Sequence, residues 1–129
     1  MTREVIRPPG VFNSPNYSHA IKKTGTPVFI SGQVAMDAAG HPVGEGDAEA
    51  QARSALASLK LVVEACGGTM ADIVKITVFT TDLAHRAAIG KARAEFFPAG
   101  EMPASTFLVI SSLADPRYLV EIEAVAMIG

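Results

Sequence analysis

The sequence predicts an α+β protein in which two helices cover one face of a mixed β-sheet. Two observations lead to this fold class. Strand and helix patterns follow one another in the order ββαβαββ, and a long helix pattern joins two strand patterns as a crossover unit. Such a crossover is right-handed and places its helix on one face of the sheet. The chain has 129 residues, 49% of them hydrophobic and 19% charged, so we expect one globular domain over residues 1–129.

The first third of the chain consists of short extended segments. The segment "EVI" (residues 4–6) begins extended and is stopped by Pro8-Pro9-Gly10, because proline has no N–H for a β-ladder. Residues 17–25 predict a strand closed by a turn, and residues 27–37 predict a strand that ends in a loop rich in glycine and proline. Gly32 interrupts this last strand and indicates a β-bulge or the close approach of another group.

Residues 47–66 give the clearest helix pattern in the chain. Apolar residues recur three and four positions apart, acidic residues lie in the first turn, and Gly67-Gly68 ends the pattern. The apolar stripe contains Ala48, Ala52, Ala55, Leu56, Leu59, Val62, Val63 and Cys66. Because Cys66 closes this stripe, we expect its thiol to lie in the core.

The second half of the chain adds a strand, a helix and two more strands. Residues 73–81 have the composition of a strand, and residues 83–98 predict a helix that Pro98 ends. Residues 104–113 and 118–128 predict two further strands joined by the turn-like sequence "ADPR". Both faces of these last strands carry large apolar groups, whereas the helices cover only one face. We therefore expect a homo-oligomer in which other copies of the chain cover the second face.

Charge and composition exclude several functional classes. The formal net charge is −2 and the eleven lysines and arginines are scattered, so phosphate neutralisation, and with it a nucleic-acid partner, is not expected. The one cysteine excludes an intramolecular disulfide and a multi-cysteine metal site, and no histidine has an acid or cysteine at ligand spacing. There is no signal-peptide pattern and no apolar run of the ~20 residues that span a bilayer. We expect a cytoplasmic protein with no membrane partner.

Glu121 and Glu123 are the first candidates for chemistry. They lie two positions apart in a predicted strand and therefore point to the same face. Partial burial raises the pKa of a carboxyl group towards neutrality, which suits acid–base catalysis. Alternatively, the two acids form structural ion pairs with arginine or lysine across a subunit interface. The pattern alone leaves both interpretations open.

Four segments together resemble the RidA/YjgF family of reactive-intermediate deaminases, also called endoribonuclease L-PSP. They are "FISGQV" (29–34), "DIVKITVFTTDL" (72–83), "AEFFP" (94–98) and "VEIEAVA" (120–126). The resemblance implies a chorismate-mutase-like fold assembled as a homotrimer, with small-molecule clefts between subunits. It also implies hydrolysis of enamines or imines to a keto acid and ammonia without a metal or organic cofactor.

The resemblance also assigns roles to individual residues. It matches Glu121 to the acid that positions or activates water, Tyr17 to the tyrosine of the N-terminal loop, and Ser31 and Gly32 to the family's "SGQ" segment. One role is missing. The family's arginine, which holds the substrate carboxylate with a bidentate fork, is replaced by Ser105 in "PAST" (103–106).

This replacement changes the expected cleft. Ser105, Thr106 and Phe107 are expected to line the cleft, and Ser105 and Phe107 to make it smaller, more apolar and less cationic than the standard site. A lost bidentate grip removes hydrogen bonds of ~1.5–3 kcal/mol each, which predicts altered specificity. An asparagine common in the family aligns with Gly90. Arg117 in the "ADPR" loop either supplies a substitute cation for the cleft or is a solvated turn residue.

Three functional interpretations follow from the sequence. The first is a homotrimeric enamine or imine deaminase of altered specificity, with small-metabolite pockets between subunits. The second is a non-catalytic family member that binds a small ligand or a protein. The third is an RNA-cleaving translation inhibitor, against which the slightly acidic composition argues.

Overall fold

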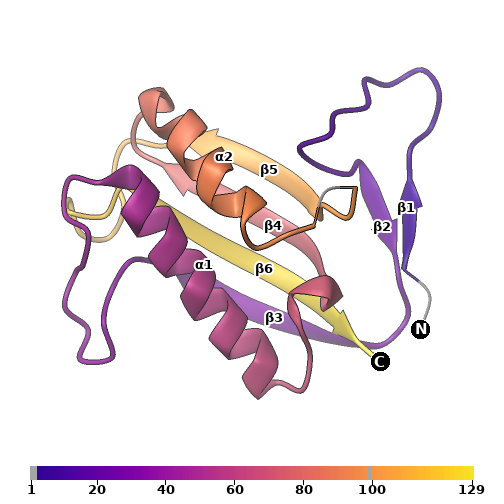
Figure 1. Cartoon of the computed structure of the whole chain (residues 1–129), viewed down its shortest axis with the longest axis horizontal. Helices are drawn as coiled ribbons and strands as arrows, with labels where there is room; N and C mark the ends of the chain where they lie inside the picture. Colours follow the sequence, from indigo (N-terminus) through magenta and orange to yellow (C-terminus); the bar gives the residue numbers. More distant parts are fainter. Residues whose placement is uncertain (1–2, 99) are drawn as a thin grey trace.

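A four-stranded mixed sheet forms the centre of the molecule (Figure 1). A computed structural model describes residues 3–98 and 100–129. The sheet contains β3 (Thr26–Gln33), β6 (Val120–Ile128), β4 (Ile73–Thr80) and β5 (Ala104–Val109), in that spatial order. The edge strand β5 runs parallel to β4, whereas β6 is antiparallel to both of its neighbours. Although β5 and β6 are consecutive in the chain, β4 lies between them.

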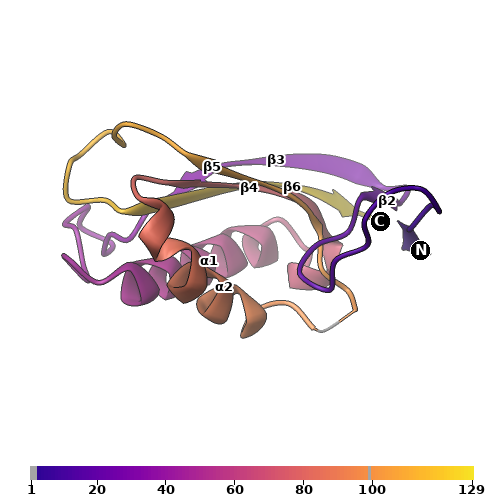
Figure 2. The ribbon, with the colours of Figure 1, turned by 90° about the horizontal axis from the view of Figure 1, so that it is seen from above.

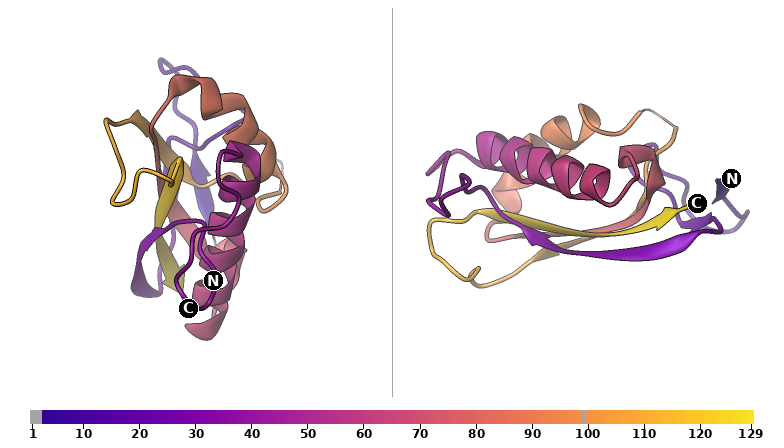
Figure 3. Two further views of the ribbon diagram at one scale, coloured as in Figure 1. Left: turned by 90° about the vertical axis from the view of Figure 1, so that its left-hand side faces the viewer. Right: turned by 90° about the horizontal axis from the view of Figure 1, so that it is seen from below.

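Both helices lie on the same face of this sheet, which confirms the prediction from the crossover pattern (Figures 2 and 3). Helix α1 (Ala48–Ala65) is capped by Asp47, whose carboxylate accepts the Ala50 N–H at 3.0 Å. Helix α2 (Arg86–Ala94) is shorter than predicted, because its first turn is the separate 3₁₀ helix η2 (Leu83–His85). A second 3₁₀ turn, η1 (Met70–Asp72), precedes β4. Within the described part of the chain, no helix is long and apolar enough to cross a membrane.

The N-terminal segment forms a small second sheet beside the edge strand β5. Strands β1 (Glu4–Ile6) and β2 (Ala20–Lys22) pair with each other in antiparallel fashion. Ser18, just before β2, is fastened to the start of β5, because its N–H donates to the Pro103 carbonyl at 3.2 Å. Three strands therefore precede the first helix instead of the predicted two. The connection between β1 and β2 is held at the edge of the main sheet.

The core lies between the helices and the facing row of the sheet. Burial alternates along β4 and β6, as expected for a sheet with one covered face. The fully buried members of this core include Leu56, Leu59, Val63, Ile73, Ile76, Val78, Val120 and Ile122. The prediction for Cys66 was wrong. This residue is the C-cap of α1, beyond the last helical turn, and its thiol is exposed.

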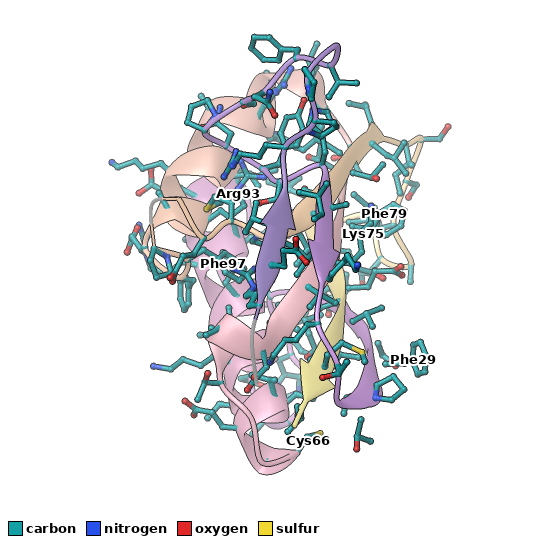
Figure 4. The ribbon with its side chains drawn as sticks, turned by 90° about the vertical axis from the view of Figure 1, so that its right-hand side faces the viewer. Phe29, Cys66, Lys75, Phe79, Arg93 and Phe97 are labelled. Atoms are coloured by element: carbon teal, nitrogen blue, oxygen red, sulfur yellow. The ribbon has the colours of Figure 1, made fainter. Side chains whose placement is uncertain are left out.

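The opposite face of the sheet is open and largely apolar. Phe29 is 79% exposed and Leu108 is 42% exposed, while Phe79 and Val125 are half-buried. Figure 4 shows Phe29 and Phe79 on the side of the sheet that lies away from the helices. The second apolar face predicted from the sequence is therefore present, and nothing in the described chain covers it.

Candidate functional site

A pocket of about 880 Å³ lies on the helix side of the edge strand β5. Its walls come from three parts of the chain: the N-terminal loop with Phe12 and Tyr17, the segment of η2 and α2, and strand β5 with Ser105 and Phe107. The attachment of Ser18 to Pro103 keeps the N-terminal loop next to the start of β5. The pocket thus depends on residues that are far apart in the sequence.

The register of β5 determines which of its side chains reach this pocket. Ser105 lies opposite Ile76, and Phe107 lies opposite Val78. Because Ile76 and Val78 are fully buried beneath the helices, Ser105 and Phe107 also point to the helix side. Thr106 points to the other face, where its hydroxyl oxygen accepts a hydrogen bond from the Lys75 ammonium at 2.6 Å. The predicted group of three consecutive residues is therefore divided between the two faces.

Two side chains with hydroxyl groups, Tyr17 and Ser105, line the pocket. The Ser105 hydroxyl oxygen is buried and has no hydrogen-bond partner among residues 3–98 and 100–129. The Tyr17 ring lies edge-on to His19, with 5.4 Å between ring centroids. Both Tyr17 and Ser105 line the pocket, as expected for residues of a ligand site.

Two arginines of α2, Arg86 and Arg93, also line the pocket, and the sequence analysis did not identify them. The Arg86 guanidinium lies 5.6 Å from the centre of the Phe107 ring, at cation–π distance. Arg93 is more deeply placed, and its Nε atom is buried without a hydrogen-bond partner in the described structure (Figure 4). Burial lowers the pKa of Arg93, and the nearby charge of Arg86 lowers it further. The pocket therefore contains two arginines, and the lower positive charge expected relative to the standard site stays a prediction.

The spacing of these two arginines is the feature of the sequence from which their common position could have been predicted. They are seven residues apart, which places them on one stripe of α2 together with Ile89 and Gly90. Ile89 is almost fully buried and Arg93 is half-buried, whereas Arg86 at the start of α2 is exposed, so the stripe leads from the solvent towards the core.

Glu121 lies in a second cluster, on the open face of the sheet. It is opposite Phe79 in the register and is half-buried. The predicted irregularity at Gly32 is confirmed, because the pairing of β3 with β6 shifts between Ile30 and Gln33. A Cβ atom on Gly32 would lie 1.9 Å from a carboxylate oxygen of Glu121. The missing side chain of Gly32 therefore makes room for the Glu121 carboxylate.

The predicted site residues thus form two groups within one chain. Tyr17, Ser105 and Phe107 share the pocket on the helix side, whereas Gly32 and Glu121 meet on the open face. The two groups lie on opposite faces of the sheet. One chain alone does not bring them together.

A family model identifies the relatives of this chain. The model described as Endoribonuclease L-PSP matches residues 12–128. The chain belongs to the endoribonuclease L-PSP family. This is the RidA/YjgF family that the four sequence segments resemble, so that prediction is confirmed.

Solved structures of L-PSP family members are similar along the chain. YyfB, a Rid-family protein of unknown function from Yersinia pestis, is 37% identical, with 99% of this chain and 100% of that chain covered and a TM-score of 0.90. RidA from an Antarctic Psychrobacter is 33% identical over 87% of this chain and 88% of that chain, with a TM-score of 0.74. A Mycobacterium tuberculosis member of the YjgF/YER057c/UK114 family is 27% identical over 98% of this chain and 100% of that chain, with a TM-score of 0.71. The predicted α+β fold class is confirmed.

Two further predicted residues of this L-PSP family member lie outside the pocket. Ser31 is exposed, and its carbonyl accepts a hydrogen bond from the Gln33 side chain at 2.9 Å. Arg117 donates to the Asp115 carboxylate at 3.0 and 2.7 Å, and this contact lowers the pKa of Asp115 to about 2. Within one chain Arg117 is not part of the pocket wall, so a role as substitute cation stays a prediction. Over the described residues, no group of three or more histidine, cysteine or acidic side chains could hold a metal ion.

Proposed function

We propose that this L-PSP family member hydrolyses a small enamine or imine to a carbonyl compound and ammonia, at sites between the subunits of a homotrimer. The observation that carries the proposal is the division of the site between two faces. Tyr17 and Ser105 line the pocket on the helix side, whereas the Glu121 carboxylate lies on the open side. A neighbouring copy whose open face meets the pocket would supply the missing carboxylate.

The exposed apolar surface supports such an assembly. Phe29, Phe79 and Leu108 lie on the open face, and Phe29 is 79% exposed. Apolar groups gathered on one face of a sheet are typical of a protein interface. A second copy of the chain would bury these groups and, in the same contact, bring Glu121 to its neighbour's pocket.

The proposed reaction requires one proton-accepting group. The Glu121 carboxylate accepts a proton from water while the water oxygen forms a bond to the carbon of the protonated imine, giving a neutral carbinolamine. The protonated Glu121 returns this proton to the nitrogen, the C–N bond breaks and ammonia leaves, and the hydroxyl proton passes to solvent as the carbonyl group forms. Phe107 provides an apolar wall, and Gly32 leaves space for the carboxylate.

The experiment compares two substitutions on the same strand. Imines are generated in situ from a panel of amino acids by an amino-acid oxidase, and ammonia release is measured with and without the protein. We expect the protein to accelerate release and Glu121→Gln to reduce the acceleration by about 10²–10⁴-fold, the usual contribution of a positioned base. Glu123→Gln is the matched control, because Glu123 lies two residues further along β6 on the same face and is exposed. Light scattering should give three times the 13.5-kDa chain mass.

Three outcomes would contradict the proposal. A monomeric protein would exclude a shared site. No acceleration on any imine would favour the second interpretation, a non-catalytic ligand-binding member. Equal losses in the two glutamine variants would show that Glu121 has no special role. RNA cleavage that persists through repeated purification would support the third interpretation.

A further inference from the structure

Leu119, the residue just before β6, has both of its neighbouring peptide groups held by side chains from other elements. Its N–H donates to the side-chain oxygen of Gln51 at 2.8 Å. Its carbonyl accepts a hydrogen bond from the Thr80 hydroxyl at 2.7 Å. These two bonds fix the chain immediately before β6, the strand that carries Glu121.

Gln51 is a buried amide that makes three hydrogen bonds. It lies near the start of α1 and is 1% exposed. Besides accepting from Leu119, it donates through Nε2 to the carbonyl of Arg117 at 2.9 Å and to that of Gly44 at 3.2 Å. Both donors and the acceptor of the amide are thus used, as expected for a buried polar group. The side chain of Gln51 joins helix α1 to the segment that leads into β6.

Thr80 extends these contacts to the 3₁₀ helix η2. It is fully buried at the end of β4, and its hydroxyl oxygen lies 3.0 Å from Nδ1 of His85. A hydroxyl group has one proton, and that of Thr80 is donated to Leu119, so the oxygen accepts the N–H of His85. Neutral His85 therefore has its proton on Nδ1. The three side chains of Gln51, Thr80 and His85 together form a unit that we call the Leu119 clamp.

The start of β6 has a neighbouring strand on one side only. Its pairing with β3 reaches Gln33 and Ile122, beyond the bulge, whereas its pairing with β4 continues to Thr80 and Val120. Glu121 therefore lies past the last pair with β3. The ends of strands open more readily than the middle of a sheet, because fewer hydrogen bonds must break. The Leu119 clamp adds hydrogen bonds at the end of the strand where β3 provides none.

We infer that Gln51, Thr80 and His85 are positioning residues for Glu121. The clamp fixes the backbone two residues before Glu121 and so holds the carboxylate where it can take a proton from water. It acts through the backbone of β6, because none of the three side chains belongs to the pocket wall and Thr80 lies on the helix face of the sheet. Since Glu121 is the base of the reaction proposed above, this inference rests on that proposal.

The first test measures ammonia release by variants of the clamp. Thr80→Val replaces the hydroxyl by a methyl group of similar size, and Gln51→Met removes the other bond to Leu119. We expect each to lower kcat by about tenfold to a hundredfold, the effect of a displacement of about 1 Å at a reacting group. KM should change much less, because the pocket wall is intact. Thr80→Ser keeps the hydroxyl and should recover most of the lost rate.

Val63→Ala is the matched control for stability. Val63 is fully buried in α1, at the opposite end of this helix from Gln51, and takes no part in the clamp. Its truncation leaves a cavity and destabilises the fold. We expect kcat of this variant to stay close to that of the wild type. Circular dichroism and light scattering check the folding and assembly of every variant at the assay temperature.

The second test follows the clamp without the reaction. Amide hydrogen exchange at residues 119–122 should become faster by about tenfold or more in Thr80→Val and Gln51→Met, the factor expected for a lost hydrogen bond. Val63→Ala should show no such local increase. Nitrogen NMR of His85 should detect the proton on Nδ1 in the wild type and a mixture of the two tautomers in Thr80→Val.

The outcomes separate the inference from the proposed function. Unchanged kcat in Thr80→Val and Gln51→Met, an equal loss in Val63→Ala, or unchanged exchange at residues 119–122 would each overturn the inference. Ammonia release by the wild type together with any of these results would leave the proposed function standing without the clamp. A wild type that releases no ammonia would overturn the proposed reaction, whereas faster exchange confined to residues 119–122 would still support the clamp as the structure that holds Glu121.

Discussion

The two faces of the central sheet differ in what covers them, and the candidate site is divided between the two. On the helix face, Val78 and Ile122 are fully buried beneath α1 and α2. On the open face, Val125 is half-buried and Phe29 is mostly exposed. Strand β6 contributes to both, with one row of side chains in the core and the other row on the open surface. One row of side chains in β6 thus stabilises the core, and the other row is available for contact with another chain.

The two faces also differ in the charged side chains that they carry. The pocket on the helix side has the cations of Arg86 and Arg93 without an acid, and the open face has the carboxylates of Glu121 and Glu123. On the open face the Lys75 ammonium accompanies the two carboxylates, whereas the pocket has no acid among its lining residues. In the proposed assembly, a contact between the open face of one copy and the pocket edge of another would bring Glu121 and Glu123 towards Arg86 and Arg93.

The largest expected effect on stability comes from truncating one side chain in each of the two rows of β6. Ile122→Ala should lower the free energy of unfolding by about 2–5 kcal/mol, because it leaves a cavity in a fully packed core. Val125→Ala should act mainly on assembly, so that its melting temperature depends on protein concentration more strongly than that of the wild type. Thermal unfolding at two concentrations measures both. Equal, concentration-independent losses would show that the open face is not an interface.

Local patterns in the sequence were sufficient to predict much of the fold. The stripe of α1 identified its buried face, because helical periodicity fixes which side chains share a face. Gly32 indicated the bulge, because a glycine inside a strand pattern is typical of a bulge or of the close approach of another group. The pairing of "EVI" with β2 and the end of α1 before Cys66 were missed. Both depend on contacts or on a boundary that a local pattern does not fix.

The candidate site was harder to predict because it depends on tertiary placement. Ser105 and Thr106 are neighbours in the chain, but strand geometry sends them to opposite faces. Arg86 and Arg93 gave no signal in composition, since arginines on a short helix are usually solvated. Only the packing of α2 beside β5 shows that their stripe faces a pocket. The family resemblance directed attention to position 105 and not to the helix across from it.

A smaller and more specific effect is expected at Gly32. In Gly32→Ala the new methyl group would overlap the Glu121 carboxylate, and that flexible side chain would move away. A displacement of about 1 Å at a reacting group can cost on the order of 10²-fold in rate, whereas stability should change by less than ~1 kcal/mol. Ammonia release and urea unfolding measure the two effects. In a Glu121→Gln background the same substitution should cost nothing further, since the two residues act through one group.

The smallest expected effect is a gain in stability at Gly90, on the pocket side of α2. Glycine in a helix interior is less favourable than alanine by roughly 0.5–1 kcal/mol, and a Cβ at Gly90 would meet nothing within 4 Å. Gly90→Ala should therefore raise the free energy of unfolding by about that amount. Ala88→Gly is the matched control in the same helix, outside the pocket wall, and should lower it by a similar amount. The opposite result would be a loss of stability in Gly90→Ala that increases with protein concentration. It would mean that a partner chain fills the space beside Gly90, so that the pocket is part of a subunit interface and not a ligand site.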